Sequence, residues 1–209
     1  MNETATLPGK VAPRQRRAVA TRAALLAAVE RIVAQAGPDA LTTTRLAEET
    51  GVAVGTIYRY FSGREELLLA AYDATVQRIV ADCRAAMEAM PRDLPAAEAA
   101  RRLLRRYLDA AEAIPAHAGL LRAMRAIRPI EADQTGSPAV DMARDLIAPA
   151  LERFLPGGGA VPAERLRLMN VVMGTMVDFY LVAQDPQAKE RIAADIEAHV
   201  GLMLERLAG

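Results

Sequence analysis

The chain has 209 residues, 26 basic and 26 acidic side chains, and 52% hydrophobic residues, which is ordinary for a soluble globular protein of one large or two small domains. No segment approaches the roughly 18 consecutive apolar residues of a membrane span, and the first ten residues lack an apolar stretch. The single cysteine, Cys83, excludes an internal disulfide, so we expect a cytoplasmic protein.

Proline and glycine punctuate the whole chain, and no alternating strand pattern extends beyond a few residues. We therefore predict an all-α fold of about nine helices. The first predicted helix covers residues 14–36, where apolar residues recur at helical spacing until Gly37 and Pro38 end it.

Residues 41–67 contain a short helix, a glycine turn and a second short helix, at the spacing of a helix-turn-helix unit. The turn needs a positive φ, which Gly51 adopts without steric cost. We expect Thr43 to cap the first of these helices, and Ser62 with Glu65 to form a capping box for the helix that follows.

The second short helix, from Val54 to Phe61, has two faces. Ile57 and Phe61 are four residues apart and are expected to point inward. Gly55 and Thr56 are small enough to approach base edges in a major groove. Tyr58, Tyr60 and Arg64 would then fix the register through phosphate contacts.

This segment resembles the tetracycline-repressor (TetR-type) family. The shared pattern consists of Thr43 and Thr44, Leu46 and Ala47, Gly51 and Val52, Gly55 to Tyr58, Phe61 and Arg64. The family usually has lysine in place of Arg64, and arginine retains the positive charge. The resemblance implies a three-helix DNA-binding domain, a helical ligand-binding and dimerisation domain, and a homodimer on a double-stranded DNA operator.

Charge is distributed unevenly along the chain. The segment from Lys10 to Arg64 has nine basic and four acidic residues, a net charge of +5, which leaves −5 for the remainder. Such an excess suits a polyanion, although a solvated basic tail is the alternative for each arginine. The candidate DNA-binding residues are Arg14, Arg17, Thr43, Thr44, Val54, Gly55, Thr56, Tyr58, Tyr60 and Arg64.

A long helix over residues 63–90 is predicted to leave the DNA-binding domain and enter the next one. Further helices are predicted near residues 96–113, 116–127, 138–155, 163–184 and 187–207. The breaks at 128–137 and 156–162 are the connections that we expect to be most flexible.

The last two predicted helices are apolar around much of their circumference, which favours a four-helix bundle between two subunits. An ordinary intrachain core is the alternative. The candidate dimer-interface residues are Met176, Tyr180, Ile192, Ile196, Val200 and Met203.

Every methionine except Met1 falls at or after Met87, and methionine adapts well to irregular apolar ligands. The candidate ligand-binding residues are Tyr107, His117, Met124, Met142, Phe154, Met173, Asp178 and Phe179. Plain core packing is the alternative for each. We predict neither an enzyme nor a cofactor or metal site, because the two histidines lack metal-ligand spacing and no nucleophile motif or phosphate loop is present.

These features predict a disordered arm over residues 1–13, a helix-turn-helix domain over 14–66 and a ligand-binding and dimerisation domain over 67–209. The leading hypothesis is a repressor that a small apolar effector releases from a palindromic operator. The alternatives are an activator whose DNA binding the ligand promotes, and a helical ligand-binding or adaptor protein whose N-terminal motif contacts protein.

Overall fold

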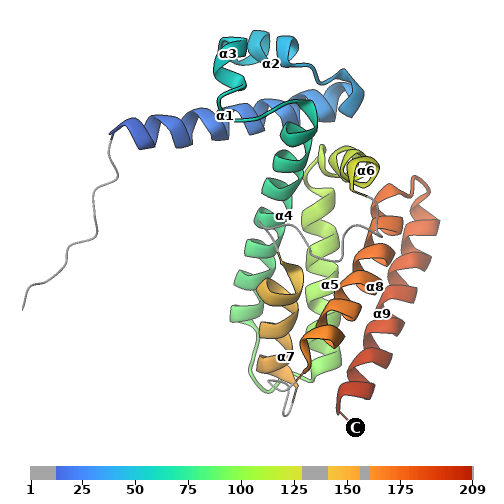
Figure 1. The fold of residues 1–209 in the computed structure, drawn as a ribbon. Coiled ribbons are helices and arrows are strands. Elements are labelled where there is room, and N and C mark those ends of the chain that lie inside the picture. Colours follow the sequence, from blue (N-terminus) through green and yellow to red (C-terminus); the bar gives the residue numbers. More distant parts are fainter. Residues whose placement is uncertain (1–12, 129–140, 156–160, 209) are drawn as a thin grey trace, which may run out of the picture.

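The structure is a computed structural model that describes residues 13–128, 141–155 and 161–208 (Figure 1). These residues form nine α-helices, and the described ranges contain no β-strand, so the predicted all-α class is confirmed. The predicted arm lies outside the described residues except for its last residue, Pro13, which begins the first helix. None of the described helices is long and apolar enough to cross a membrane.

The N-terminal unit consists of α1 (Pro13–Ala36), a 3₁₀ turn (Pro38–Ala40), α2 (Thr43–Thr50) and α3 (Val54–Ile57), which pack on the start of α4 (Arg64–Ala89). Its core includes Leu25 and Ile32 of α1, Leu46 of α2 and Ile57 of α3, all at most 1% exposed. Apolar residues at helical spacing thus hold the 3₁₀ turn, α2 and α3 in one core with α1.

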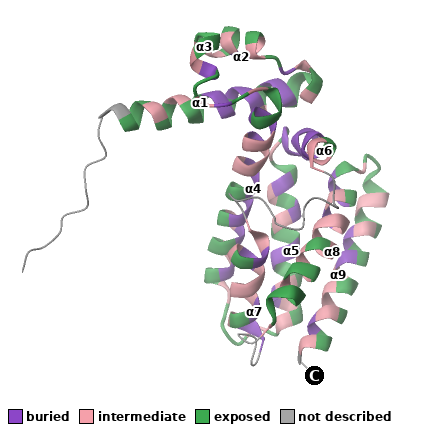
Figure 2. Ribbon diagram, in the orientation of Figure 1, coloured by how far each residue is buried: buried purple, intermediate pink, exposed green. Residues whose placement is uncertain are grey.

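The second unit is a bundle that α1 crosses at one end (Figure 1). It contains the rest of α4, α5 (Ala96–Glu112), α6 (His117–Ile127), a π-helical segment (Ala143–Ile147) continued by α7 (Ala148–Phe154), α8 (Ala163–Val182) and α9 (Pro186–Ala208). Buried residues lie along the inner faces of these helices (Figure 2). Cys83 is among them, and burial raises the pKa of its thiol to about 12, which suits a structural thiol.

Two helices belong to both cores. Leu68 and Ala71 of α4 lie in the N-terminal core, whereas Ile79 lies in the second core, and Tyr72 packs against both. On α6, Leu120 faces the first core and Leu121 the second. The predicted boundary between residues 66 and 67 stays a prediction, but a movement of α4 or α6 must affect both units.

Two predicted helix caps are wrong by one residue each. Thr42, not Thr43, caps α2, because its side-chain oxygen accepts the Arg45 N–H at 3.1 Å. Ser62 pairs with Glu66 rather than Glu65, and the Glu66 carboxylate accepts both the Ser62 N–H and its hydroxyl at 2.6 Å. Consecutive hydroxyl or carboxyl residues satisfy the same sequence pattern, and backbone geometry selects between them.

The two predicted flexible connections lie largely outside the described residues. The helix predicted over 138–155 begins in the structure as the π-helical segment and continues as α7.

Candidate functional site

The turn between α2 and α3 has the geometry that the sequence predicts. Gly51 adopts φ 68°, and its N–H donates to the Ala47 carbonyl at 2.9 Å, which ends α2. Ile57 is fully buried and Phe61 is 2% exposed, so both anchor α3 to the N-terminal core. The turn and the two buried anchors fix the angle between α2 and α3.

α3 presents its other side to solvent at the end of the molecule away from the bundle (Figure 2). Val54 and Gly55 are exposed, and Tyr58 is 54% exposed. No heavy atom lies within 4 Å of a Cβ built on Gly55, so this face is open. The regular α-helix covers only Val54–Ile57, and the chain continues to Phe61 as turns.

Most of the other candidate DNA-binding residues lie in the same unit. Thr44 and Arg17 are exposed, whereas Thr43 and Thr56 are half-buried. Tyr60 departs from its predicted outward position, because it is half-buried and packs against the N-terminal core. Arg14 belongs to α1, but its side chain lies outside the described part of the molecule.

Arg64 has intramolecular contacts that the sequence did not predict. Its Nε donates to the Leu41 carbonyl at 3.1 Å, and one terminal nitrogen donates to the Pro38 carbonyl at 2.9 Å and to Asp39 at 3.1 Å. The guanidinium therefore braces the loop between α1 and α2 against the start of α4. A phosphate contact would have to use the donors that remain.

Two cations near α3 were missing from the predicted site. Arg45 lies in the first turn of α2, and Arg59 comes shortly after α3. Neither has an ion-pair partner among the described residues. By contrast, Arg31 pairs with Glu49 at 3.0 Å. The available signal was the surplus of basic residues over acidic partners in this stretch.

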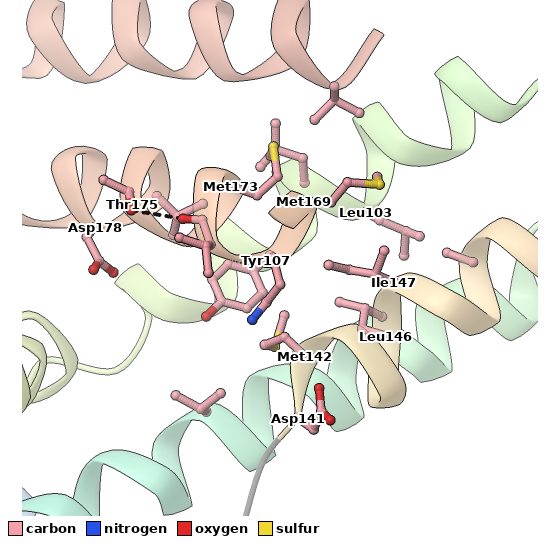
Figure 3. A pocket seen from close by; sticks show the side chains of 18 of the residues that line it. Leu103, Tyr107, Asp141, Met142, Leu146, Ile147, Met169, Met173, Thr175 and Asp178 are labelled. Atoms are coloured by element: carbon pink, nitrogen blue, oxygen red, sulfur yellow. Dashed lines mark hydrogen bonds between the residues drawn. The ribbon is translucent and has the colours of Figure 1, made fainter. Parts of the chain in front are cut away.

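The second unit contains a cavity of about 270 Å³ between α4, α5, α6, the π-helical segment, α7, α8 and α9 (Figure 3). Its lining is mainly aliphatic and thioether side chains, among them Leu103, Met142, Leu146 and Met169. The volume is just below the range of about 300–1,000 Å³ that is usual for small-molecule sites.

Several polar side chains also border the cavity. Arg125, in the last turn of α6, donates to Asp178 of α8 at 2.6 Å, and both side chains are less than a quarter exposed. Tyr107 of α5 also borders the cavity. Burial, with a smaller contribution from Asp178, raises the pKa of its phenol, so the hydroxyl keeps its proton.

Comparisons with known proteins identify the N-terminal unit. Residues 25–71 match the family model described as bacterial regulatory proteins, tetR family. The N-terminal unit is a TetR-family domain. Among curated proteins, none matches this chain in sequence.

Solved structures of transcriptional regulators, two of them described as TetR proteins, share the fold over nearly the whole chain. The TetR family repressor AlkX from a Dietzia strain is 16% identical with a TM-score of 0.60, over 95% of this chain and 98% of that one. A TetR transcriptional regulator from a Rhodococcus strain is 22% identical with a TM-score of 0.55, over 93% and 100%. FadR from Bacillus subtilis, solved with stearoyl-CoA, is 16% identical with a TM-score of 0.52, over 90% and 97%. At these identities the similarity establishes the TetR-type fold.

Within this TetR-type fold, five of the eight candidate ligand-binding residues line the cavity: Tyr107, Met124, Met142, Met173 and Asp178. The other three do not. Phe154 is 8% exposed in the second core, and Phe179 is 65% exposed on the outside of α8. His117 is buried between the two units, where it contacts α4 instead of the cavity.

His117 connects α6 to α4 next to the cavity. The Thr75 hydroxyl donates to the Tyr72 carbonyl at 2.7 Å, so its oxygen is left to accept the His117 Nδ1–H at 2.8 Å. The imidazole also stacks on Tyr72, with 5.6 Å between ring centroids. Tyr72 lines the cavity, so a ligand there would border this contact.

The candidate dimer-interface residues face inward in the structure. Ile196 is fully buried, Tyr180 is 9% exposed, and Met176, Ile192 and Val200 pack against the second core. Met203 is half-buried. The exposed apolar side chains of α8 and α9 form a different surface, here called the outer stripe: Leu168, Val171, Phe179, Val182 and Leu202. Ile196 and Tyr180 are therefore core residues, whereas the other four are partly exposed and stay interface candidates. The outer stripe is more exposed than any of them.

Proposed function

We propose that this protein is a ligand-controlled DNA-binding transcription regulator. One observation carries the proposal: α4 begins in the core of the TetR-family domain, and about two to three turns later its side chains Tyr72, Asp73 and Val76 line the cavity. A ligand that displaces this part of α4 would also reorient the helix-turn-helix unit. Binding to DNA and binding in the cavity are then coupled through one rigid element.

The proposed DNA-reading surface is the open face of α3. Gly55 and Thr56 approach base edges in the major groove, while Tyr58 and the cations Arg17, Arg45 and Arg59 contact phosphates. Thr43, Thr44 and Val54 flank this surface, and Tyr60 supports it from the core side. Arg14 and Arg64 stay candidate phosphate contacts.

We infer that the active form is a homodimer that buries the outer stripe. Two subunits related by a two-fold axis present two α3 helices to an inverted-repeat operator, whose half-sites must be about 34–36 Å apart for successive major grooves. A stripe of exposed leucine, valine and phenylalanine side chains on the last two helices supports this arrangement.

The effector that we propose is a small, mainly apolar molecule, because the lining of the cavity is mainly apolar. It acts as an inducer, and the regulator as a repressor. AlkX is described as a repressor implicated in n-alkane degradation, and FadR was solved with stearoyl-CoA. Both descriptions concern molecules with an alkyl chain.

Close packing between α6 and α1 supports the coupling. A Cβ added to Gly119 would lie 2.8 Å from Val33 Cγ1, so the two helices meet without spare room. Arg78 of α4 also donates to Glu30 of α1 at 2.6 Å. Small shifts of α4 or α6 would therefore be transmitted to α1.

Selection of bound duplexes from a random pool tests the proposed function. The expected product is an inverted repeat, bound by the wild type and lost with Gly55→Gln, because a long side chain on the open face of α3 blocks entry to the groove. The space around Gly55 predicts unchanged thermal unfolding for this variant. Selection of no sequence, or full sequence preference in the folded Gly55→Gln variant, would contradict the proposal.

A further inference from the structure

The cavity wall is mainly apolar with a minority of polar groups. Ala100, Leu103, Leu151 and Leu204 are among its apolar residues. Its charged and polar residues include Asp73, Tyr107, Arg125, Arg128, Asp141, Asn170, Thr175 and Asp178. In Figure 3, Tyr107 lies between Met173 and Met142, with Asp178 and Thr175 to its left and Met169, Leu103 and Ile147 to its right. A ligand that fills the cavity therefore meets mainly apolar side chains and a few polar groups.

Tyr107 has an unused hydrogen-bond donor. Tyr107 is half-buried and borders the cavity, and desolvation raises the pKa of its phenol, which stays protonated. Among the described residues, none makes a hydrogen bond with its hydroxyl, whereas Thr175 nearby donates to its own helix at 2.8 Å. A hydroxyl that borders a cavity without an intramolecular partner is available to donate to an acceptor within that cavity.

The neighbouring charges restrict what this partner is. Arg125 already donates to Asp178 at 2.6 Å, so an anionic head group would have to compete with Asp178 for the guanidinium. Asp73, Asp141 and Asp178 outnumber Arg125 and Arg128 on the cavity wall, and Asp178 contributes to the raised pKa of Tyr107. This excess of negative charge disfavours an anion beside the hydroxyl, whereas an uncharged oxygen acceptor needs only the phenol proton.

We propose that the effector is an uncharged amphiphile: an apolar chain or ring system with one oxygen acceptor, such as an ester or ketone carbonyl, that accepts the Tyr107 hydroxyl proton. The apolar part lies against Leu103, Leu151 and Leu204. This assignment rests on the proposed function, since it names the ligand class of the same cavity.

Three probes of similar length test the assignment: methyl decanoate, dodecane and decanoate. Their affinities are measured on the DNA-free, full-length protein by displacement of an apolar fluorescent dye, for the wild type and for Tyr107→Phe. We expect methyl decanoate to bind most tightly, and Tyr107→Phe to weaken it about 3- to 10-fold, the effect of one neutral hydrogen bond, with dodecane unchanged. The matched control is Tyr180→Phe, because Tyr180 is 9% exposed and does not line the cavity.

Several results would overturn the assignment: decanoate as the tightest probe, no displacement by methyl decanoate, or the same change for ester and hydrocarbon in Tyr107→Phe. Since the assay contains no DNA, its result is independent of the proposed function. An ester that binds through Tyr107 but leaves operator affinity unchanged would keep the ligand class and contradict ligand-controlled DNA release.

Discussion

At the scale of single residues, Arg59 provides a direct test of the DNA-reading surface. It is exposed beside α3 and has no ion-pair partner within the described residues. Arg59→Ala should weaken binding to all duplexes alike and lower the slope of log affinity against log salt by about 1, because one phosphate contact is lost. Arg92→Ala is the matched control, since Arg92 is exposed beyond the far end of α4. Equal salt slopes for wild type and Arg59→Ala would remove Arg59 from the interface.

His117 predicts a pH dependence of stability. Burial, with a smaller effect from Arg78, lowers the pKa of His117 from 6.5 to about 4, so the folded protein keeps the imidazole neutral while the unfolded chain takes up a proton. Stability contributed by the neutral form is therefore complete above pH 6.5 and is lost as the pH falls toward 4. The loss should be at most about 3 kcal/mol of unfolding free energy.

Urea unfolding at several pH values measures this effect. His117→Asn retains an N–H donor for Thr75 but does not titrate, so the difference in unfolding free energy between wild type and variant should shrink from pH 6.5 to 4. His199→Asn is the control, because His199 is exposed on α9. A difference that stays constant with pH would show that His117 is not held neutral.

At the scale of helices, the outer stripe makes a prediction about assembly. Phe179→Glu should give a folded monomer, because position 179 is 65% exposed in the isolated chain and a carboxylate there stays hydrated. Ile196→Glu should instead unfold the protein, since burying an unpaired carboxylate costs several kcal/mol. Sedimentation and circular dichroism separate the two outcomes. A Phe179→Glu variant that dimerises as tightly as wild type would place the interface elsewhere.

The helices and the DNA-reading motif were predictable because their signals are local. Spacing, glycine and proline mark helix ends within a few residues, and Gly51, Ile57 and Phe61 lie within one short segment. Periodicity could not decide which side of α8 faces outward, since this helix is apolar on both sides. Phe179 was consequently proposed for the ligand site, although it is 65% exposed.

Contacts between distant residues were not predictable for a related reason. His117 was proposed for the ligand site because it is a polar residue among apolar ones, but its partner Thr75 lies 42 positions earlier in the chain. Arg64 was assigned to phosphate because of its motif, whereas its carbonyl partner on Leu41 is 23 positions away. In both cases tertiary packing, which a single sequence does not display, selects the partner.

At the scale of the whole molecule, ligand binding in the cavity and DNA binding at the α3 surface must be coupled through α4 and α6. A ligand can shift operator affinity only by its differential affinity for the DNA-competent and DNA-incompetent conformations, typically about 1–3 kcal/mol or roughly 5- to 150-fold. The reciprocal effect must have the same size, so operator DNA must weaken the ligand by the factor by which the ligand weakens operator binding.

Titration calorimetry of one cavity ligand, with and without a saturating operator duplex, measures this coupling most directly; methyl decanoate is the first ligand to use. The ligand should bind more weakly to the DNA-bound protein than to the DNA-free protein. The factor should equal the one by which the ligand weakens operator binding, measured in a separate experiment. Equal ligand affinities in the two states, for a ligand that a cavity variant such as Tyr107→Phe shows to be bound there, would contradict ligand-controlled DNA binding.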